Sequence, residues 1–280
     1  MENHEKIEFF KSRSVSDIVS VTFSFVKQGF KPLISSLLLI VIPMTILSTI
    51  LIGSNDLFKG GQMEPNAIAG NFVILLANYF VMFTGLFLIM LVTNSYMLLY
   101  YSKENFKEIT LSEIWDVVIS KILHSFLGGI LYFIALALGF VLILIPGIWL
   151  SISFSLLFPV IFFEDKNGAD ALGRSFNLVK NNWWATLGVL LLITIIFYAI
   201  SLVFLLPSYI VAFTVGFNQL GDGNFNMQPI MMIMTFIGSL SYILYPVFYI
   251  STAFQYFNLV ERKEAKGLMD KVNSIGNQVQ

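Results

Sequence analysis

The sequence contains no cysteine and only two histidines in 280 residues. The lack of cysteine excludes disulfides, cysteine-ligated metal, a thiol nucleophile and acylation of a cysteine. His4 lies in the N-terminal arm and His124 near the start of an apolar run, so the two form no cluster that could hold a metal. No P-loop, nucleophile elbow or zinc-helix motif is present. We therefore expect no catalytic residues, no cofactor and no metal.

Charged side chains are also scarce. They make up 12% of the chain, whereas hydrophobic residues make up 57%; an average soluble domain has about 25% charged residues. The formal net charge of -1 gives no excess of positive charge for nucleic acid, and no nucleic-acid-binding motif is present. The composition predicts an all-α membrane protein that is surrounded by lipid and does not bind nucleic acid.

Long apolar runs predict six membrane-spanning helices, because a span needs about 20 apolar helical residues. One run is about twice that length and contains Pro146-Gly147, which predicts two helices joined by a tight hairpin at that point. The stretch after Pro207 is weakly apolar, and we expect it to lie along the surface. The five runs are 32–55, 70–102, 122–163, 181–221 and 223–260, and the run 122–163 supplies two of the six spans.

The basic residues are distributed asymmetrically between the two sides of the predicted bundle. Fifteen of the sixteen lysines and arginines fall on one side, and only Lys59 falls on the other. Because basic residues are retained in the cytoplasm, both termini are predicted to be cytoplasmic. The first span lacks a small-residue cleavage site and is read as a retained anchor. We expect one integral membrane domain, with a cytoplasmic arm at 1–31, a six-span bundle at 32–260 and a cytoplasmic tail at 261–280.

One charged segment, NGADALGRSFNLVKNNWW from Asn167 to Trp184, interrupts the apolar sequence. Asn167 is followed three positions later by Asp170, a pattern typical of a helix N-cap with an acid in the first turn. Apolar residues then recur at helical spacing on one face. This predicts an amphipathic helix in the membrane interface, with tryptophans at headgroup depth. The surface predicted to meet lipids or partners comprises Asp170, Leu172, Arg174, Ser175, Phe176, Val179, Lys180, Trp183 and Trp184.

The same pattern begins at Ser14 and at Thr110, each time before an apolar run. In all three copies an acid follows three positions after the first residue, and an aromatic residue follows sixteen positions after it. We infer a pseudo-threefold repeat of one interfacial helix and two spans, with the first unit enlarged by the loop 54–69. The alternative is that capping boxes and amphipathic helices are common enough to coincide.

The conspicuous polar residues within a span are Asn78 and Asn94 in the second one. They are consistent with a lined pathway, although interhelical hydrogen bonding is the commoner use of such residues. We find no charge in the spans of the kind that marks ion-coupled transport. Glu164 and Asp165, at the end of the fourth span, are interpreted as caps or partners of nearby basic side chains and not as a catalytic pair.

The run LIPGIWLSISFSLLFPVIFFEDKNGADALGRSFNLVKNNWWATLG, Leu144 to Gly188, resembles the membrane domain attached to some bacterial glycerophosphodiester phosphodiesterases and is similar to YciC-like inner-membrane proteins. The resemblance implies a multi-span bacterial inner-membrane protein. It transfers no activity, because those enzymes hydrolyse their substrate in a separate barrel domain with a divalent metal, for which this sequence has neither residues nor room. It implies that Arg174-Ser175 anchors the signature at the cytoplasmic face. The features shared are Pro146-Gly147, Pro159, Glu164-Asp165, Ala171-Leu172, Arg174-Ser175 and Trp183-Trp184.

Two functional hypotheses lead. The first is a non-enzymatic inner-membrane protein that organises lipids, or inner-membrane or cytoplasmic protein partners, at the cytoplasmic face, since the amphipathic helices are the unusual surfaces of the chain. The second is a transporter or lipid-translocating protein, because repeats are common in transporter folds and the second span carries polar residues. A membrane-lipid enzyme is a distant third.

Overall fold

The computed structural model describes residues 6–59, 67–142, 144–219 and 226–278. Those residues are largely helical and include no strand. This confirms the all-helical prediction and gives six candidate spans. Parts of the predicted arm, of the loop 54–69 and of the tail lie outside the described residues. The candidate spans are Lys31–Ser54, Ile68–Ser102, Leu111–Val141, Leu144–Glu164, Trp183–Val203 and Gln228–Glu264.

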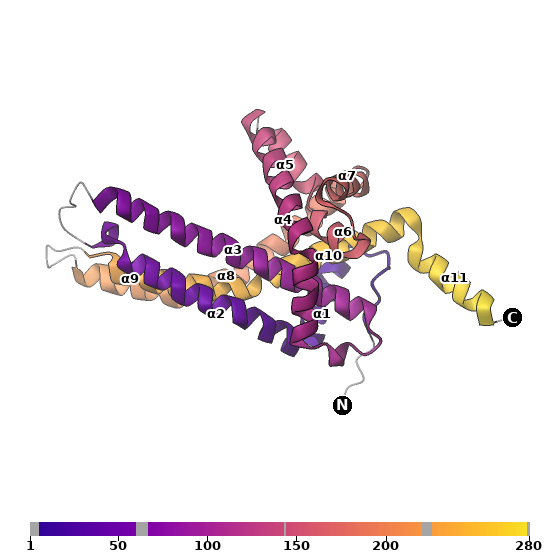
Figure 1. The fold of residues 1–280 in the computed structure, drawn as a ribbon, viewed down its shortest axis with the longest axis horizontal. Helices are drawn as coiled ribbons and strands as arrows, with labels where there is room; N and C mark the ends of the chain where they lie inside the picture. Colours follow the sequence, from indigo (N-terminus) through magenta and orange to yellow (C-terminus); the bar gives the residue numbers. More distant parts are fainter. Residues whose placement is uncertain (1–5, 60–66, 143, 220–225, 279–280) are drawn as a thin grey trace. The chain divides into compact units, whose positions relative to one another are not determined.

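Two compact units are formed by contacts within the chain, and each is described by itself. Figure 1 shows the helices that build them. Unit 1 is Met1–Leu33, Leu91–Ile195 and Pro246–Gln280, and contains α1 (Val15–Gln28), the short η2 (Phe106–Glu108), α4 (Leu111–Leu142), α5 (Leu144–Ser153), α6 (Leu157–Glu164), α7 (Gly168–Val179), α10 (Pro246–Glu264) and α11 (Lys266–Gln278). Unit 2 is Ile34–Met90 and Ile196–Tyr245, and contains η1 (Asp56–Phe58), α9 (Gln228–Leu240) and η3 (Ser241–Leu244). Three long helices contribute residues to both units: α2 (Phe30–Ser54), α3 (Ala67–Ser102) and α8 (Trp183–Gln219).

The three predicted helix caps form as hydrogen bonds. At the start of α1, the Ser14 hydroxyl accepts from the Asp17 N–H at 3.2 Å, and the Asp17 carboxylate accepts from the Ser14 N–H at 3.1 Å. At α7, the Asn167 side-chain oxygen accepts from the Asp170 N–H at 3.0 Å. The Thr110 N–H donates to the glutamate three positions on at 2.9 Å. Each cap satisfies an N–H group that the first helical turn leaves without a partner.

The second copy of the predicted repeat differs from the other two. The helix that begins after Thr110 does not end before the apolar run, because α4 continues without a break for 32 residues. α1 ends at Gly29, and α7 ends before Asn181-Asn182; glycine and asparagine are frequent where helices end. The matching position in α4 is Ser125, and the helix passes through it. Two separate amphipathic helices therefore exist where three were expected, and the pseudo-threefold relation stays a prediction.

Two further helix boundaries differ from the sequence predictions. α8 continues through Pro207 to Gln219, where a surface stretch was expected. In an apolar environment the backbone groups need partners within the helix, which outweighs the one hydrogen bond that a proline removes. Pro146-Gly147 lies inside the first turn of α5 and does not form the turn itself. Proline is tolerated there, because the N–H groups of a first turn have no helical partner.

The C-terminal tail, which was expected to be merely polar, forms α11 over Lys266–Gln278. It follows Ala265, whose φ of 49° breaks the direction of α10. Leu268, Met269 and Val272 are exposed on α11, and their helical spacing was the signal for this helix in the sequence.

Unit 2 contains a polar junction between the ends of α2 and α3. The Asn55 side chain is fully buried and donates to the Asn71 carbonyl at 3.0 Å. The Asn71 side-chain oxygen accepts from the Asp56 N–H at 2.8 Å. These bonds satisfy polar groups where the chain leaves α2, which is required of any backbone buried away from water.

The core of unit 1 is aromatic. The Phe9 ring is 4% exposed, and its centroid lies 4.8 Å from that of Phe257 and 5.5 Å from that of Phe254. Beside it the Arg13 N–H donates to the Asn258 side chain at 2.8 Å. The N-terminal arm is therefore held against α10 by residues that precede α1.

A contact between two glycines sets the position of α7 against α4. A Cβ atom added to Gly168 would lie 2.6 Å from the Gly128 Cα and 2.7 Å from the Gly128 nitrogen. Backbone atoms cannot move aside as the end of a side chain can. Position 168 therefore requires glycine, a Cβ atom at Gly128 would be tightly packed at 3.2 Å from the Gly168 Cα, and the beginning of α7 lies against the middle of α4.

We expect Gly168→Ala to destabilise the protein by about 1–3 kcal/mol, because the added methyl overpacks a contact between backbones. Gly173→Ala is the matched control on the same helix, since a Cβ atom there has no neighbour within 4 Å and alanine favours helix by about 1 kcal/mol. The melting temperature of the detergent-solubilised protein, followed by size-exclusion chromatography after heating, should fall for the first variant and hold or rise for the second. Equal melting temperatures would contradict the close contact.

Candidate functional site

The residues of the predicted surface on α7 divide into buried, half-buried and exposed groups. Ser175 and Val179 are fully buried with Ala171, and together they face neighbouring helices of unit 1. Phe176 is half-buried, with its ring centroid 5.4 Å from that of Trp149. Two of the nine residues predicted to meet lipids or partners, Ser175 and Val179, therefore pack inside the protein. The exposed members are Asp170, Lys180 and Trp184, while Leu172, Arg174 and Trp183 are intermediate.

Ser175 satisfies a break in the fourth candidate span. The chain leaves the helix between Ser153 and Leu157, because the ring of Pro159 is incompatible with a helical carbonyl four residues earlier. The Ser175 hydroxyl donates to the Ser153 carbonyl at 2.9 Å and accepts from the Leu156 N–H at 3.2 Å. One side chain thus replaces two backbone partners that the break removes.

Arg174 joins three helices through ion pairs. Its Nε lies 2.8 Å from a carboxylate oxygen of Glu164 at the end of α6, and its Nη2 lies 2.5 Å from a carboxylate oxygen of Glu264 at the end of α10. The Tyr256 hydroxyl donates to Glu164 at 3.2 Å. Burial lowers the pKa of Arg174, but the bonds to the two glutamates outweigh burial, and the pKa is raised above its usual value. Arg174 therefore stays charged and links α7 to the ends of α6 and α10.

Glu164 and Asp165 are adjacent in sequence but have different partners. Asp165 is exposed, ends α6 with a φ of 53°, and pairs with Lys121 of α4. The hydrogen bond from Lys121 lowers the pKa of Asp165. This agrees with their interpretation as partners of basic residues. Among the described residues, no group of three or more His, Asp or Glu side chains is arranged to hold a metal ion.

An open groove of about 570 Å³ lies where α7 gives way to α8. One wall is the segment from Lys180 to Ala185, and the other is the beginning of α5, with Ile145, Ile148 and Trp149. The Trp183 indole N–H donates to the Trp149 carbonyl at 3.3 Å, and the Trp183 and Trp184 rings meet edge to face at 4.8 Å. The groove combines one cation and two side-chain amides with an apolar wall.

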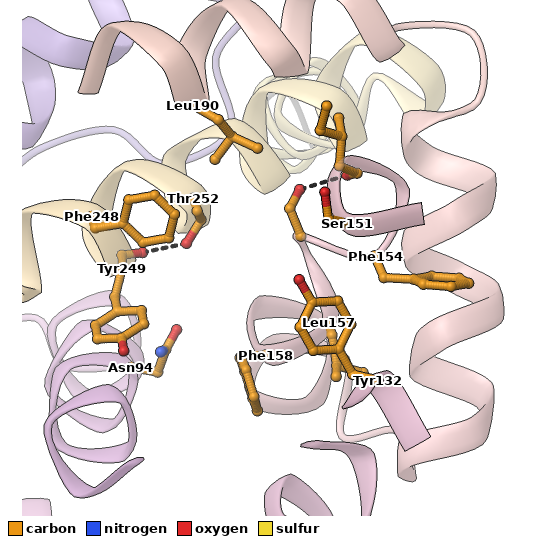
Figure 2. Close-up of a pocket in the computed structure, with 12 residues that line it drawn as sticks. Asn94, Tyr132, Ser151, Phe154, Leu157, Phe158, Leu190, Phe248, Tyr249 and Thr252 are labelled. Carbon is orange, nitrogen blue, oxygen red and sulfur yellow. Dashed lines mark hydrogen bonds between the residues drawn. The ribbon is translucent and has the colours of Figure 1, made fainter. Parts of the chain in front are cut away.

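The two predicted intramembrane asparagines lie in different units. Asn78 belongs to unit 2, where its side-chain nitrogen lies 3.8 Å from the Met82 sulfur. Asn94 belongs to unit 1 and lines a cavity of about 300 Å³. Figure 2 shows Asn94 and Tyr249 on one side of this cavity and Tyr132 on the other. The two asparagines therefore do not share one lined pathway within either unit.

Several residues that build the site were not singled out from the sequence. Trp149 provides the carbonyl and the ring that position Trp183 and Phe176, and its only signal was an aromatic residue shortly after Pro146-Gly147. Glu264 completes the Arg174 network from α10. No local pattern connects it with residues ninety positions away, so only the packing of α10 against α7 identifies it.

A protein-family model matches residues 134–278, and its description is the membrane domain of glycerophosphoryl diester phosphodiesterase. The match covers more than half of the chain and includes α5, α7, the groove and α10. The chain belongs to this family. The family match confirms the resemblance that the run from Leu144 to Gly188 indicated. No match was found among the curated proteins or among the solved structures.

A substitution of Ser175 tests whether its hydroxyl stabilises the break between α5 and α6. We expect Ser175→Ala to leave the Leu156 N–H without a partner at a fully buried site, and so to cost about 1–3 kcal/mol of stability. Asn177→Ala is the control, because its side chain is exposed on the same helix. Thermal unfolding of the two purified variants measures the difference. If Ser175→Ala melted with the control, the break would not depend on this hydroxyl.

Proposed function

We propose that the protein is a non-enzymatic integral membrane protein that holds phospholipids with anionic headgroups at the cytoplasmic face of the membrane. The groove between α5 and the α7–α8 junction carries this proposal. Its volume of about 570 Å³ lies within the range of about 300–1,000 Å³ that is usual for ligand sites.

The chemistry of the groove favours a lipid over a soluble ligand. Lys180 is exposed and supplies a positive charge for a phosphate group, while the amides of Asn181 and Asn182 offer donors and acceptors beside it. Ile145 and Ile148 give an apolar surface for the start of an acyl chain. Trp184 is 78% exposed, and tryptophan favours the depth of lipid headgroups.

Protein partners are a weaker interpretation of this surface. The predicted partner surface was centred on Arg174 and the apolar face of α7. Arg174 is occupied by Glu164 and Glu264, and the buried residues of α7 pack on α4 and α6. The members of the surface that remain exposed are Asp170, at the beginning of α7, and Lys180 and Trp184, which line the groove.

The retention of lipid in the purified protein tests the proposal. Native mass spectrometry should find anionic phospholipid bound to the wild type after exchange into mild detergent. Lys180→Gln should weaken retention about fivefold, because one basic residue near an anionic surface contributes about 1 kcal/mol. Trp184→Ala should weaken it as well.

Lys107→Gln serves as the control, since Lys107 is exposed and does not line the groove. Equal retention in the Lys180 and Lys107 variants would remove the groove as the lipid site. A specific protein that copurifies with the wild type and is lost from the Lys180 variant would instead support the organisation of protein partners.

Lipid translocation is the second candidate, and the cavity beside Asn94 favours it. The cavity is mainly apolar but also lined by Ser151, Ser155 and Thr252, which suits an amphiphile that leaves the bilayer sideways. If this function holds, vesicles that contain the protein should exchange fluorescent phospholipids between leaflets, and Asn94→Leu should slow the exchange at least tenfold. Asn78→Leu is the comparison outside the cavity. If the leading proposal holds instead, vesicles that contain the wild-type protein should exchange phospholipids between leaflets no faster than vesicles without protein.

A further inference from the structure

Two lysines from different helices meet at the C-terminal end of α7. The Lys263 ammonium group, on α10, donates a hydrogen bond to the Asn177 carbonyl. That carbonyl is one of the last four of α7, and the last four carbonyls of a helix have no helical partners. Lys180 follows Asn177 by three positions, which is less than one helical turn. Lys180 and Lys263 therefore bring their charges to the same end of α7.

The two lysines are not neutralised by carboxylates of their own. Both Glu164 and Glu264 bond to Arg174. In the part of the chain that the structure describes, neither Lys180 nor Lys263 forms an ion pair with a carboxylate. The charges of Arg174 and Lys180 repel Lys263, while the charge of Glu264 attracts it. The three cations outnumber the two carboxylates, so this end of α7 keeps an excess of positive charge.

The end of the helix offsets only part of that charge. The carbonyls at a helix C-terminus are equivalent to about half a negative charge, whereas the two exposed ammonium groups carry two positive charges. An ammonium group has three N–H donors, so Lys263 keeps donors beyond the one that Asn177 accepts. The arrangement therefore favours an anion with two negative charges over an anion with one.

Phospholipid headgroups differ in this property. A phosphodiester carries one negative charge, whereas a phosphomonoester carries about 1.5 to 2 negative charges at pH 7 and has three strong acceptor oxygens. Nearby cations favour the more highly charged form of such a group. One lysine attracts both classes of headgroup, and a second lysine adds an advantage for the phosphomonoester. Soluble phosphomonoesters share this chemistry but have no acyl chain to meet the apolar wall of Ile145 and Ile148.

We propose that Lys180 and Lys263 together select a phosphomonoester headgroup, so that the lipid held in the groove is one with a terminal phosphate, such as phosphatidic acid. This inference rests on the proposed function and names the lipid class of that site. Lys180 lines the groove itself. Lys263 adds its charge from α10, which packs against α7.

Competition between two lipids with the same acyl chains tests the inference. The purified protein is incubated with an equimolar mixture of phosphatidic acid and phosphatidylglycerol, and native mass spectrometry measures the ratio of the two bound lipids. We expect the wild type to bind phosphatidic acid about fivefold more than phosphatidylglycerol, because one further basic residue near an anionic group contributes about 1 kcal/mol. Lys263→Gln should lower this ratio to about one, and Lys263→Arg should keep it.

The two substitutions separate the charge of Lys263 from its bond to the end of α7. Glutamine and arginine can both donate to the Asn177 carbonyl, but only arginine keeps the positive charge. A loss of the preference in both variants, or the wild-type ratio in Lys263→Gln, would overturn the proposal and leave Lys263 with a structural role alone. Lys107→Gln removes an exposed lysine of the same unit that does not line the groove and should keep the wild-type ratio.

The outcomes also distinguish this inference from the proposed function. Equal binding of the two lipids, with both reduced in Lys180→Gln, would keep the lipid site and overturn the selection of a phosphomonoester. If neither lipid is retained, the proposed function and this inference fall together. Glycerol 3-phosphate, a phosphomonoester without acyl chains, identifies the source of the group. We expect an excess of it to leave phosphatidic acid bound, and displacement that depends on Lys263 would assign the site to a soluble phosphomonoester.

Discussion

The contact between Gly128 and Gly168 is the constraint on which unit 1 depends. Because two backbones meet there without Cβ atoms, α7 lies directly on α4 and its later residues reach defined partners. Ser175 then meets the break after α5, Arg174 meets the ends of α6 and α10, and Lys180 lines the groove beside the beginning of α5. A larger residue at Gly168 would separate the two helices and disturb these contacts together.

Polar groups buried in an apolar protein are usually paired, and this rule explains several residues of the run from Leu144 to Gly188. Pro159 interrupts the helix, and Ser175 replaces the backbone partners that are lost. Glu164 and Arg174 neutralise each other where α6 ends. Arg174-Ser175 was expected to anchor the cytoplasmic face, but the bonds of both residues are to neighbouring segments of unit 1, and Glu164 pairs with Arg174 as its interpretation as a partner of basic residues predicted. Lys180 and Trp184 are exposed in the groove, and our functional proposal therefore rests on them and not on Arg174.

The proposed lipid site has two parts. The beginning of α5 presents apolar side chains, and the α7–α8 junction presents a cation, amides and tryptophans. A phospholipid has the same division between acyl chains and a charged headgroup. The family match begins within α4, shortly after Gly128, and continues through both parts, which is consistent with one function for the region.

The sequence by itself determined the helical membrane class, the six apolar segments and the three N-caps, because hydropathy and capping depend on neighbouring residues. It also indicated the family from Leu144 to Gly188. Only the tertiary structure decided that α4 is continuous, that Pro146-Gly147 lies within α5, and that Ser175 and Val179 face inward. Periodicity identifies an apolar face but does not say whether lipid or protein covers it. That depends on contacts such as Arg174 with Glu264, ninety residues apart, which no local pattern encodes.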